Sequence, residues 1–302
     1  MATLKDMVDE VRANLAGYTM RQDRITYLAN PSGINTTDAS LIIGSASNLA
    51  KGIIEIDDEL IWIDTYDRVS STATVPPYGR GYNGTTAAAH NADTKVTIAP
   101  YFPKKVVKTA INDTIDAVFP KLFAVGTTTI TLLATKTSYQ IPADVETVLS
   151  VTWSVTGPSS EWLPVKSWRQ DPMANTTAFT TGQSLSVYDA ITPGRTVQVY
   201  YTKKPTTLTA SASNEVFESV TGLPSSCKDV ILYGAAYRLA SFIDPGRLTY
   251  TSAEADQTDT KIQYGSGAST ARFLLALYNQ RLTEESEKLR DVYPTRIHYT
   301  RY

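Results

Sequence analysis

The chain has 302 residues, of which 42% are hydrophobic and 19% charged, so it can bury more than one core and is not a disordered protein. The formal net charge of −2 excludes a generally basic protein that coats nucleic acid. The single cysteine, Cys227, excludes an intrachain disulfide. No signal-peptide layout and no apolar run of membrane-spanning length is present, so we expect no membrane contact.

The chain is expected to begin with a helix and to continue as a β module. Thr3 and Asp6 form a variant of the capping box ahead of apolar residues at helical spacing, which predicts an amphipathic helix over residues 3–16. Turn chemistry predicts a loop over residues 25–40. Apolar runs on both sides of three acidic residues then predict a tight hairpin over residues 53–63.

The middle of the chain repeats the order of helix and β module. Pro103 stands where a second amphipathic helix, residues 103–119, should begin. Apolar and polar residues alternate over residues 149–155 and again over 197–201. This period of two indicates half-buried strands, and the Gly and Pro turns between short strands favour a small antiparallel sandwich or barrel.

The segment that follows is predicted to be a linker and then a buried helix. Residues 203–224 are rich in Thr and Ser and are interpreted as the linker. Residues 225–243 are apolar almost all round, which is typical of a buried helix. Gly234 within this helix should allow a neighbouring helix to approach closely.

A final helix is predicted over residues 269–292, with Phe273 on its inner face and the Arg281–Glu285 pair on its solvent side. Because one amphipathic helix cannot bury its face alone, we expect an α+β fold in which a four-helix bundle carries two inserted antiparallel β modules. In chain order we expect a bundle helix in residues 1–24, the first β module in 41–100, a bundle helix in 101–124, the second β module in 125–203, the last two bundle helices in 225–292, and an extended arm in 293–302.

Residue types that carry catalysis are scarce. The two histidines, His90 and His298, lie far apart in sequence, and Cys227 lies inside an apolar helix, where a structural thiol is expected. One cysteine and two distant histidines provide no zinc-binding spacing. We therefore expect no enzyme, no cofactor and no metal site.

Residues 79–84, Gly-Arg-Gly-Tyr-Asn-Gly, match the glycine pattern of dinucleotide-binding loops. That pattern binds a pyrophosphate only between a strand and a helix, with a ribose-binding acid about twenty residues on. Here prolines precede it, and Phe102 and Pro103 stand where the acid should be. A glycine-bearing surface loop is the better interpretation.

Four acidic residues close together, Asp57, Asp58, Glu59 and Asp64, raise the question of a calcium site. The glycine and the distal glutamate that an EF-hand loop requires are absent. The first three residues are explained more simply as the tip of a hairpin, and the fourth follows the strand.

The C-terminal segment, residues 293–302, has two arginines, a histidine, three tyrosines and no acidic residue. It follows a helix and has no local partner to fold against. A frayed terminus is one interpretation. The tyrosines and the isoleucine favour the other, which is docking onto another chain. The candidate contact residues are Tyr293, Arg296, Ile297, His298, Tyr299, Arg301 and Tyr302.

Two stretches, residues 52–63 and residues 79–90 with Val96, resemble a β module found in neck, tail and baseplate proteins of tailed bacteriophages. The helical remainder, with its long final helix and extended tail, resembles the head-to-tail adaptor family. The two β insertions depart from the smallest members of that family.

The resemblance implies a structural protein of the virion neck, assembled in the bacterial cytoplasm. It implies a ring of about twelve copies that joins the portal protein to tail or neck proteins. Genomic DNA would pass through its lumen without sequence-specific binding, and residues 293–302 would reach the portal. The alternatives are a tail-tip, baseplate or fibre-base protein, and an enzyme such as a cell-wall hydrolase. Four predicted helices favour the adaptor over the mostly β alternatives.

Overall fold

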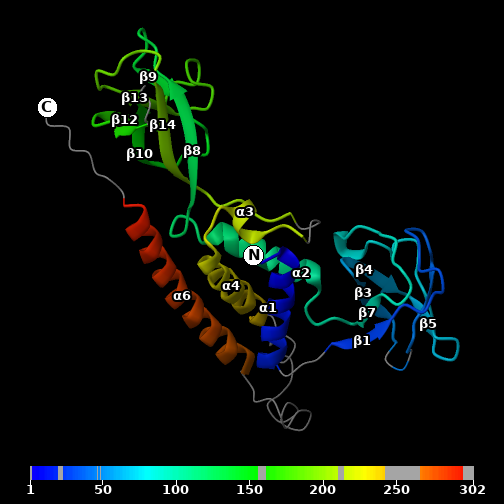
Figure 1. Cartoon of the computed structure of the whole chain (residues 1–302). Helices are drawn as coiled ribbons and strands as arrows, with labels where there is room; N and C mark the ends of the chain where they lie inside the picture. Colours follow the sequence, from blue (N-terminus) through cyan, green and yellow to red (C-terminus); the bar gives the residue numbers. More distant parts are fainter. Residues whose placement is uncertain are drawn as a thin grey trace.

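The computed structural model describes residues 2–19, 23–45, 47, 49–155, 161–209, 214–241 and 266–294. These residues form a helical core and two β modules that extend from it (Figure 1). Each of the three bodies has its own cluster of buried apolar side chains. The helical core and the two β modules thus bury separate sets of apolar side chains.

Within the described residues, the helical core contains five helices and a short 3₁₀ turn. The predicted capping box is present, since Thr3 Oγ1 accepts the Asp6 amide at 3.2 Å and Asp6 accepts the Thr3 amide at 3.0 Å. The helices are α1 (Leu4–Thr19), α2 (Lys104–Ala117), α3 (Phe217–Thr221), α4 (Lys228–Ala240) and α6 (Ser266–Val292), and η2 (Ser225–Cys227) leads into α4.

Helix α4 lies at the centre of the core. It contacts α1, α2 and α6, and side chains of all four helices join one apolar cluster. Helix α6 runs beside α4, whereas α2 crosses behind (Figure 1). The fold is thus mixed α and β with four antiparallel sheets. The predicted four-helix bundle is not shown as such, because α3 and η2 also contribute to this core.

Gly234 permits the closest approach between α2 and α4, as its position in an apolar helix predicted. A Cβ atom built on Gly234 would lie 2.3 Å from Cγ2 of Thr114 and 3.0 Å from the Tyr278 ring. Thr114 and Tyr278 belong to α2 and α6 respectively, so one glycine sets the distance of two neighbours from α4.

The first β module contains two antiparallel sheets around an isoleucine-rich core. The predicted hairpin is confirmed as β3 and β4. The prediction of a loop over residues 25–40 is wrong at both ends, because β1 pairs with β7 from Arg24 to Tyr27 and β2 begins at Ser40. The sheets are β1 (Arg24–Tyr27), β7 (Lys95–Ile98), β3 (Gly52–Ile56) and β4 (Glu59–Ile63) in one, and β2 (Ser40–Ile42), β6 (Thr72–Thr74) and β5 (Thr65–Asp67) in the other.

The second β module also has two antiparallel sheets, which enclose a common core. The two alternating segments predicted from sequence form β10 and β14, the central strands of the larger sheet. In spatial order the sheets are β11 (Trp162–Pro164), β10 (Thr147–Ser154), β14 (Thr196–Lys203) and β8 (Ala124–Thr131), and then β12 (Trp168–Asp171), β13 (Ser184–Val187) and β9 (Ser138–Gln140).

Two predictions about the C-terminal half need correction. The segment 203–224 is not a free linker, because Leu208 is buried in the helical core and exchanges two hydrogen bonds with the Asn112 side chain, at 2.8 and 3.0 Å. On α6, Phe273 is exposed, whereas Glu285 is buried. The inner face therefore includes a carboxylate, and the phenylalanine lies outside it.

We predict that Gly234→Ala destabilises the helical core by about 1–3 kcal/mol, because the added methyl group overpacks the contact with Thr114. Gly17→Ala in α1 is the matched control: nothing lies within 4 Å of its built Cβ. Alanine there should stabilise by up to about 1 kcal/mol through helix propensity. Urea unfolding followed by the helical circular dichroism signal measures both. Equal effects at the two sites would contradict the assigned packing.

Candidate functional site

The most elaborate polar cluster in the described residues surrounds the carboxylate of Glu59, which is buried at the start of β4. Arg80 donates to it from Nε at 2.8 Å and from Nη2 at 3.0 Å. The amides of Gly81 and Ala88 donate at 2.8 and 3.0 Å, and His90 Nε2 lies at 2.8 Å. Glu59 therefore binds both ends of the segment 80–90 to the hairpin.

These donors determine the protonation state of Glu59. Burial alone would raise its pKa, but the hydrogen bonds from His90, Arg80 and the two amides outweigh burial and lower the pKa to about 2. Glu59 is thus a carboxylate at neutral pH. The sequence predicted that Asp57, Asp58 and Glu59 form a hairpin tip. That prediction is wrong only for Glu59, which is buried at the start of β4.

His90 lies between two carboxylates. Its Nδ1 is 2.8 Å from Asp57 Oδ2, and its Nε2 is 2.8 Å from Glu59 Oε2. Two carboxylate acceptors require two N–H donors, so this geometry holds the charged imidazolium. Burial lowers the pKa of His90, but the hydrogen bonds to Glu59 and Asp57 more than compensate and raise it above the ordinary value of 6.5. With both nitrogens donating, the ring offers no lone pair to a substrate.

The glycine pattern of residues 79–84 serves this cluster. Gly81 adopts a left-handed conformation with φ of 60°, which directs its amide to Glu59. The turn η1 (Tyr82–Gly84) follows, and no helix long enough to hold a pyrophosphate comes after it within the segment 85–94. The loop instead covers the edge of β4, where Trp62 stacks obliquely on Tyr82 with ring centroids 5.3 Å apart.

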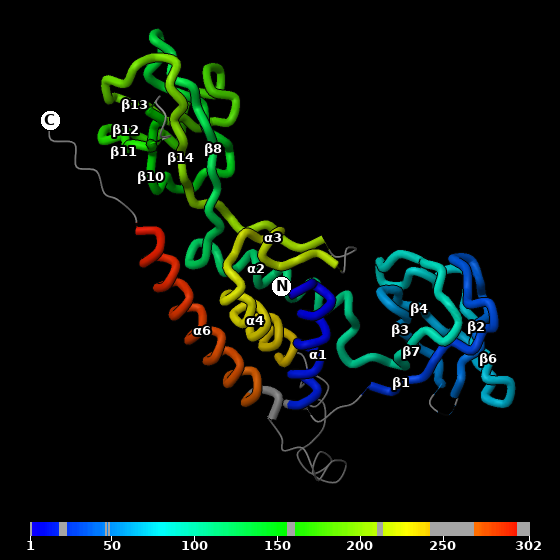
Figure 2. The backbone as a smooth tube through the Cα atoms, viewed as in Figure 1, coloured from blue at the N-terminus to red at the C-terminus, as the bar shows by residue number. Residues whose placement is uncertain are grey.

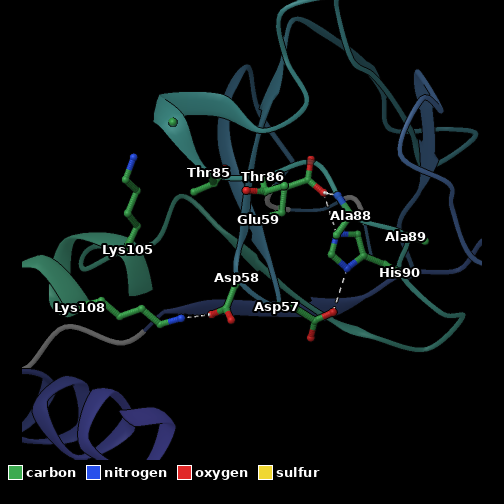
Figure 3. Close-up of a pocket in the computed structure, with 11 residues that line it drawn as sticks. Asp57, Asp58, Glu59, Thr85, Thr86, Ala88, Ala89, His90, Lys105 and Lys108 are labelled. Carbon is green, nitrogen blue, oxygen red and sulfur yellow. Dashed lines mark hydrogen bonds and ion pairs between the residues drawn. The ribbon is translucent and has the colours of Figure 1, made fainter. Parts of the chain in front are cut away.

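A hollow of about 400 Å³ opens beside this cluster, between the hairpin tip, the segment 84–90 and α2 (Figure 3). Lys108 of α2 reaches the hairpin and pairs with Asp58 at 3.0 Å. Lys105 donates to the backbone carbonyl of Asn83. The walls therefore carry charges of both signs, and the lysines are engaged in holding the β module to α2.

A second polar contact lies where the first β module meets the helical core. The Arg12 guanidinium of α1 pairs with Glu55 of β3 and with Asp23, each at 2.6 Å. The other Glu55 oxygen accepts the amide of Lys104 at the start of α2, also at 2.6 Å. We call the contact of Arg12, Asp23, Glu55 and Lys104 the polar joint. It connects β3 to both α1 and α2.

No cluster of three or more acidic, histidine or cysteine side chains suited to a metal ion occurs in the part of the chain that the structure describes. The four acids considered for calcium are separated. Asp64 pairs with Lys51 at 2.6 Å, and Asp58 pairs with Lys108. Asp57 and Glu59 instead share His90.

Cys227 is buried at the start of α4, where burial raises the pKa of its thiol to about 12. A thiol with so high a pKa is a poor nucleophile at neutral pH. The neighbouring buried carboxylate, Glu285, accepts hydrogen bonds from Ser226 at 2.5 Å and Lys288 at 2.6 Å. The Ser226 contact ties η2 to α6, and the Lys288 contact balances the charge of Glu285 within α6.

The predicted contact residues of the C-terminal arm fall mostly outside the described residues. Tyr293 is described. Its amide donates to the Leu289 carbonyl at 2.9 Å, and its ring packs edge-on against Phe123, with centroids 6.5 Å apart. It thereby places the end of α6 next to the start of the second β module. The residues outside are Arg296, Ile297, His298, Tyr299, Arg301 and Tyr302.

We predict that Arg12→Met destabilises the protein by about 3 kcal/mol, because it leaves the buried Glu55 without its cation. Lys51→Met removes a cation from the exposed Lys51–Asp64 pair and should leave the stability nearly unchanged, because solvent screens that pair. Urea unfolding measures both. Hydrogen exchange should show faster exchange in β3 and at the start of α2 in the Arg12 variant only. Similar costs for the two variants would contradict the importance of the polar joint.

We predict that the first β module loses stability as pH rises above 7. A group whose pKa is raised by folding contributes stability below its unfolded value of about 6.5, and this contribution disappears as pH passes the folded value. His90→Gln cannot become charged and should lose most of this dependence. Hydrogen exchange of β3 and β4 between pH 6 and about pH 9, corrected for the intrinsic rate, provides the measurement. A wild-type profile as flat as that of the variant would refute the imidazolium assignment.

In the described residues, no helix combines the length and apolar composition needed to cross a bilayer. Among curated proteins, none matches the chain. The family model described as SU10 adaptor protein matches residues 85–290, which is more than half of the chain and includes α2, the second β module, α4 and most of α6. The chain therefore belongs to the SU10 adaptor protein family, a family of phage structural proteins.

Proposed function

We propose that the chain forms the head-to-tail adaptor ring of a tailed bacteriophage, joining the portal protein to the tail. The observation that carries this proposal is the adaptor-family match over residues 85–290. In the proposed ring the helical core, packed as a four-helix bundle, forms the body, and genomic DNA passes through the lumen. About twelve copies would surround that lumen. The site of action is the virion neck, and assembly takes place in the bacterial cytoplasm.

The charge distribution supports a structural role more than a nucleic-acid-binding role. The net charge is −2, and the conspicuous cations Arg12, Arg80 and Lys108 are each paired with carboxylates of the same chain. A protein that held DNA through phosphate contacts would present free cations on one surface. Passage of DNA through a ring requires no such contact.

The C-terminal arm, residues 293–302, is proposed to bind the portal. Tyr293, the first residue after α6, has a side chain that is 38% exposed, so part of its ring is accessible to a partner. Its tyrosines and arginines would supply apolar area and charge-assisted hydrogen bonds. Every copy in a ring carries one arm, so weak contacts would act together.

We predict that deletion of residues 293–302 leaves a folded protein but reduces the yield of infectious particles by about 100-fold or more, because the multivalent portal contact is lost. Tyr188→Ala is the control, since Tyr188 is an exposed tyrosine in the second β module and its loss should leave the yield unchanged. Plaque counts measure the yield, and particle mass measures the ring. An undiminished yield would disprove the arm's role, and absence of the protein from necks would disprove the adaptor role.

A further inference from the structure

Most sheet edges in this protein are protected against pairing with another chain. An edge strand presents unpaired N–H and C=O groups, which natural proteins cover or interrupt. On β4, the Leu60 amide donates to Thr85 Oγ1 at 3.0 Å and the Trp62 amide to the Gly79 carbonyl at 2.8 Å. On β2, the Ile42 amide donates to the Asn30 side chain at 2.7 Å. These edges therefore have few free backbone groups that could bond to another chain.

Other edges are short or charged. Strands β5 and β9 have three residues each, and β5 ends in Asp67. Strand β1 has four residues and begins with Arg24, and β12 contains Arg169 and Asp171. Short length and charge are the usual means by which native proteins discourage edge pairing.

Strand β8 has neither protection. It is eight residues long, from Ala124 to Thr131, with no charged residue and no proline. It pairs with β14 along its whole length without a register shift, and among the described residues no strand lies on its other side. It is therefore a long, regular edge of the kind that accepts an added strand.

The register identifies the free backbone groups of β8. The Leu132 amide donates to the Arg195 carbonyl at 2.9 Å, so even-numbered residues direct their backbone groups toward β14. Thr127, Thr129 and Thr131 consequently direct theirs to the outside. Their side chains are also exposed, so a neighbouring strand meets no steric obstacle there.

The opposite edge of the same sheet is β11, as the order of the four strands in Figure 2 shows. Strand β11 is as short as β5 and β9 and contains a proline, but Trp162 and Leu163 in it are 43% and 42% exposed, so this edge presents apolar area to a neighbour. The Val165 amide donates to Val151 at 2.9 Å, which places the backbone groups of Trp162 and Pro164 on the outer side. Pro164 has no N–H. Because its nitrogen lies on the outer side of β11, the pairing of β11 with β10 loses no hydrogen bond.

We propose that β8 of one copy pairs with β11 of the next copy, joining the larger sheets of neighbouring second β modules into one. This inference rests on the proposed ring. The sheet has four antiparallel strands, so a second sheet placed beside it in the same orientation brings β11 antiparallel to β8. The direction of the strands is thus already correct for pairing.

The side-chain faces and hydrogen-bonding positions also agree. Pro164 lies opposite Thr152, Thr152 opposite Gln198, and Gln198 opposite Thr129, so Thr129 and Pro164 belong to one row on one face. Both have backbone groups on the outer side of their edges. A neighbouring copy therefore continues the row. The Thr129 N–H faces the Pro164 carbonyl, and the N–H and C=O of Thr131 face those of Trp162, so the missing N–H of Pro164 removes one hydrogen bond from the pairing.

The contact joins two different surfaces of the same protein, which is the kind of contact that closes a ring. Pairing of β8 with β8 is the competing arrangement, and it would stop at a dimer. A cysteine test separates the two, because the natural Cys227 is buried and does not interfere.

The test uses full-length protein in phage particles that carry Pro164→Cys together with Thr127→Cys, Thr129→Cys or Thr131→Cys, to cover three registers. After mild oxidation, we expect at least one pair to give a ladder of dimers, trimers and larger species on a non-reducing gel. Pro164→Cys with Met173→Cys is the matched control, because Met173 is 92% exposed in the same module but lies outside both edges. It should give no ladder.

A ladder in one of the three threonine pairs and none in the control supports the strand contact. Dimers from Thr129→Cys alone would show β8 pairing with itself and overturn it. Rings of normal particle mass without any ladder would overturn the strand contact and leave the proposed ring intact. Particles that lack the protein, when the wild-type gene is used, would overturn the ring itself.

Discussion

The polar joint determines how the first β module sits on the helical core. Among the described residues, the module and the core bury separate apolar clusters, so the apolar clusters seen there do not fix the orientation of one on the other. Arg12 and the start of α2 meet the two oxygens of Glu55, and Lys108 adds a pair with Asp58. Because both oxygens of Glu55 are bound, the contact fixes the orientation of the carboxylate, which apolar packing alone would not do. Its charges also remain costly to separate, since Glu55 is almost fully buried.

The Glu59 cluster has a similar role within the first β module, where it fixes a loop to the β3–β4 hairpin. A long loop between β6 and β7 has little regular structure of its own, and one carboxylate fixes it through a cation, an imidazolium and two amides. The cost of burying Glu59 is offset because both of its oxygens accept hydrogen bonds from several donors, two of them charged. The glycines that resemble a nucleotide-binding pattern are explained by this backbone geometry.

The sequence predicted which segments form helices and strands better than it predicted the contacts of their side chains. Helical spacing located four helices, and alternation located β10 and β14, because these patterns record burial directly. The same alternation contained the signal for Glu59, which shares a strand face with the core residues Ile61 and Ile63. The cluster itself was not predictable, since Arg80 and His90 reach Glu59 only through the fold. Likewise, the Glu285 carboxylate is buried by η2, whose position the spacing of α6 does not reveal.

The arrangement gives each β module a core of its own, apart from the helical core. Each β module is inserted at one place on the helical core, with its entry and exit strands paired in the same sheet: β1 with β7, and β8 with β14. In a module anchored in this way, the position of the anchored strands also determines where the outer strands lie. The module does this without adding side chains to the helical apolar cluster. Its outer edges are then free to be selected for contact with other chains. The covered edge of β4 and the bare edge of β8 show the two alternatives in one molecule. On β4, groups of the same chain accept hydrogen bonds from the outer backbone amides, whereas on β8 the outer backbone groups are left to solvent or to an added strand.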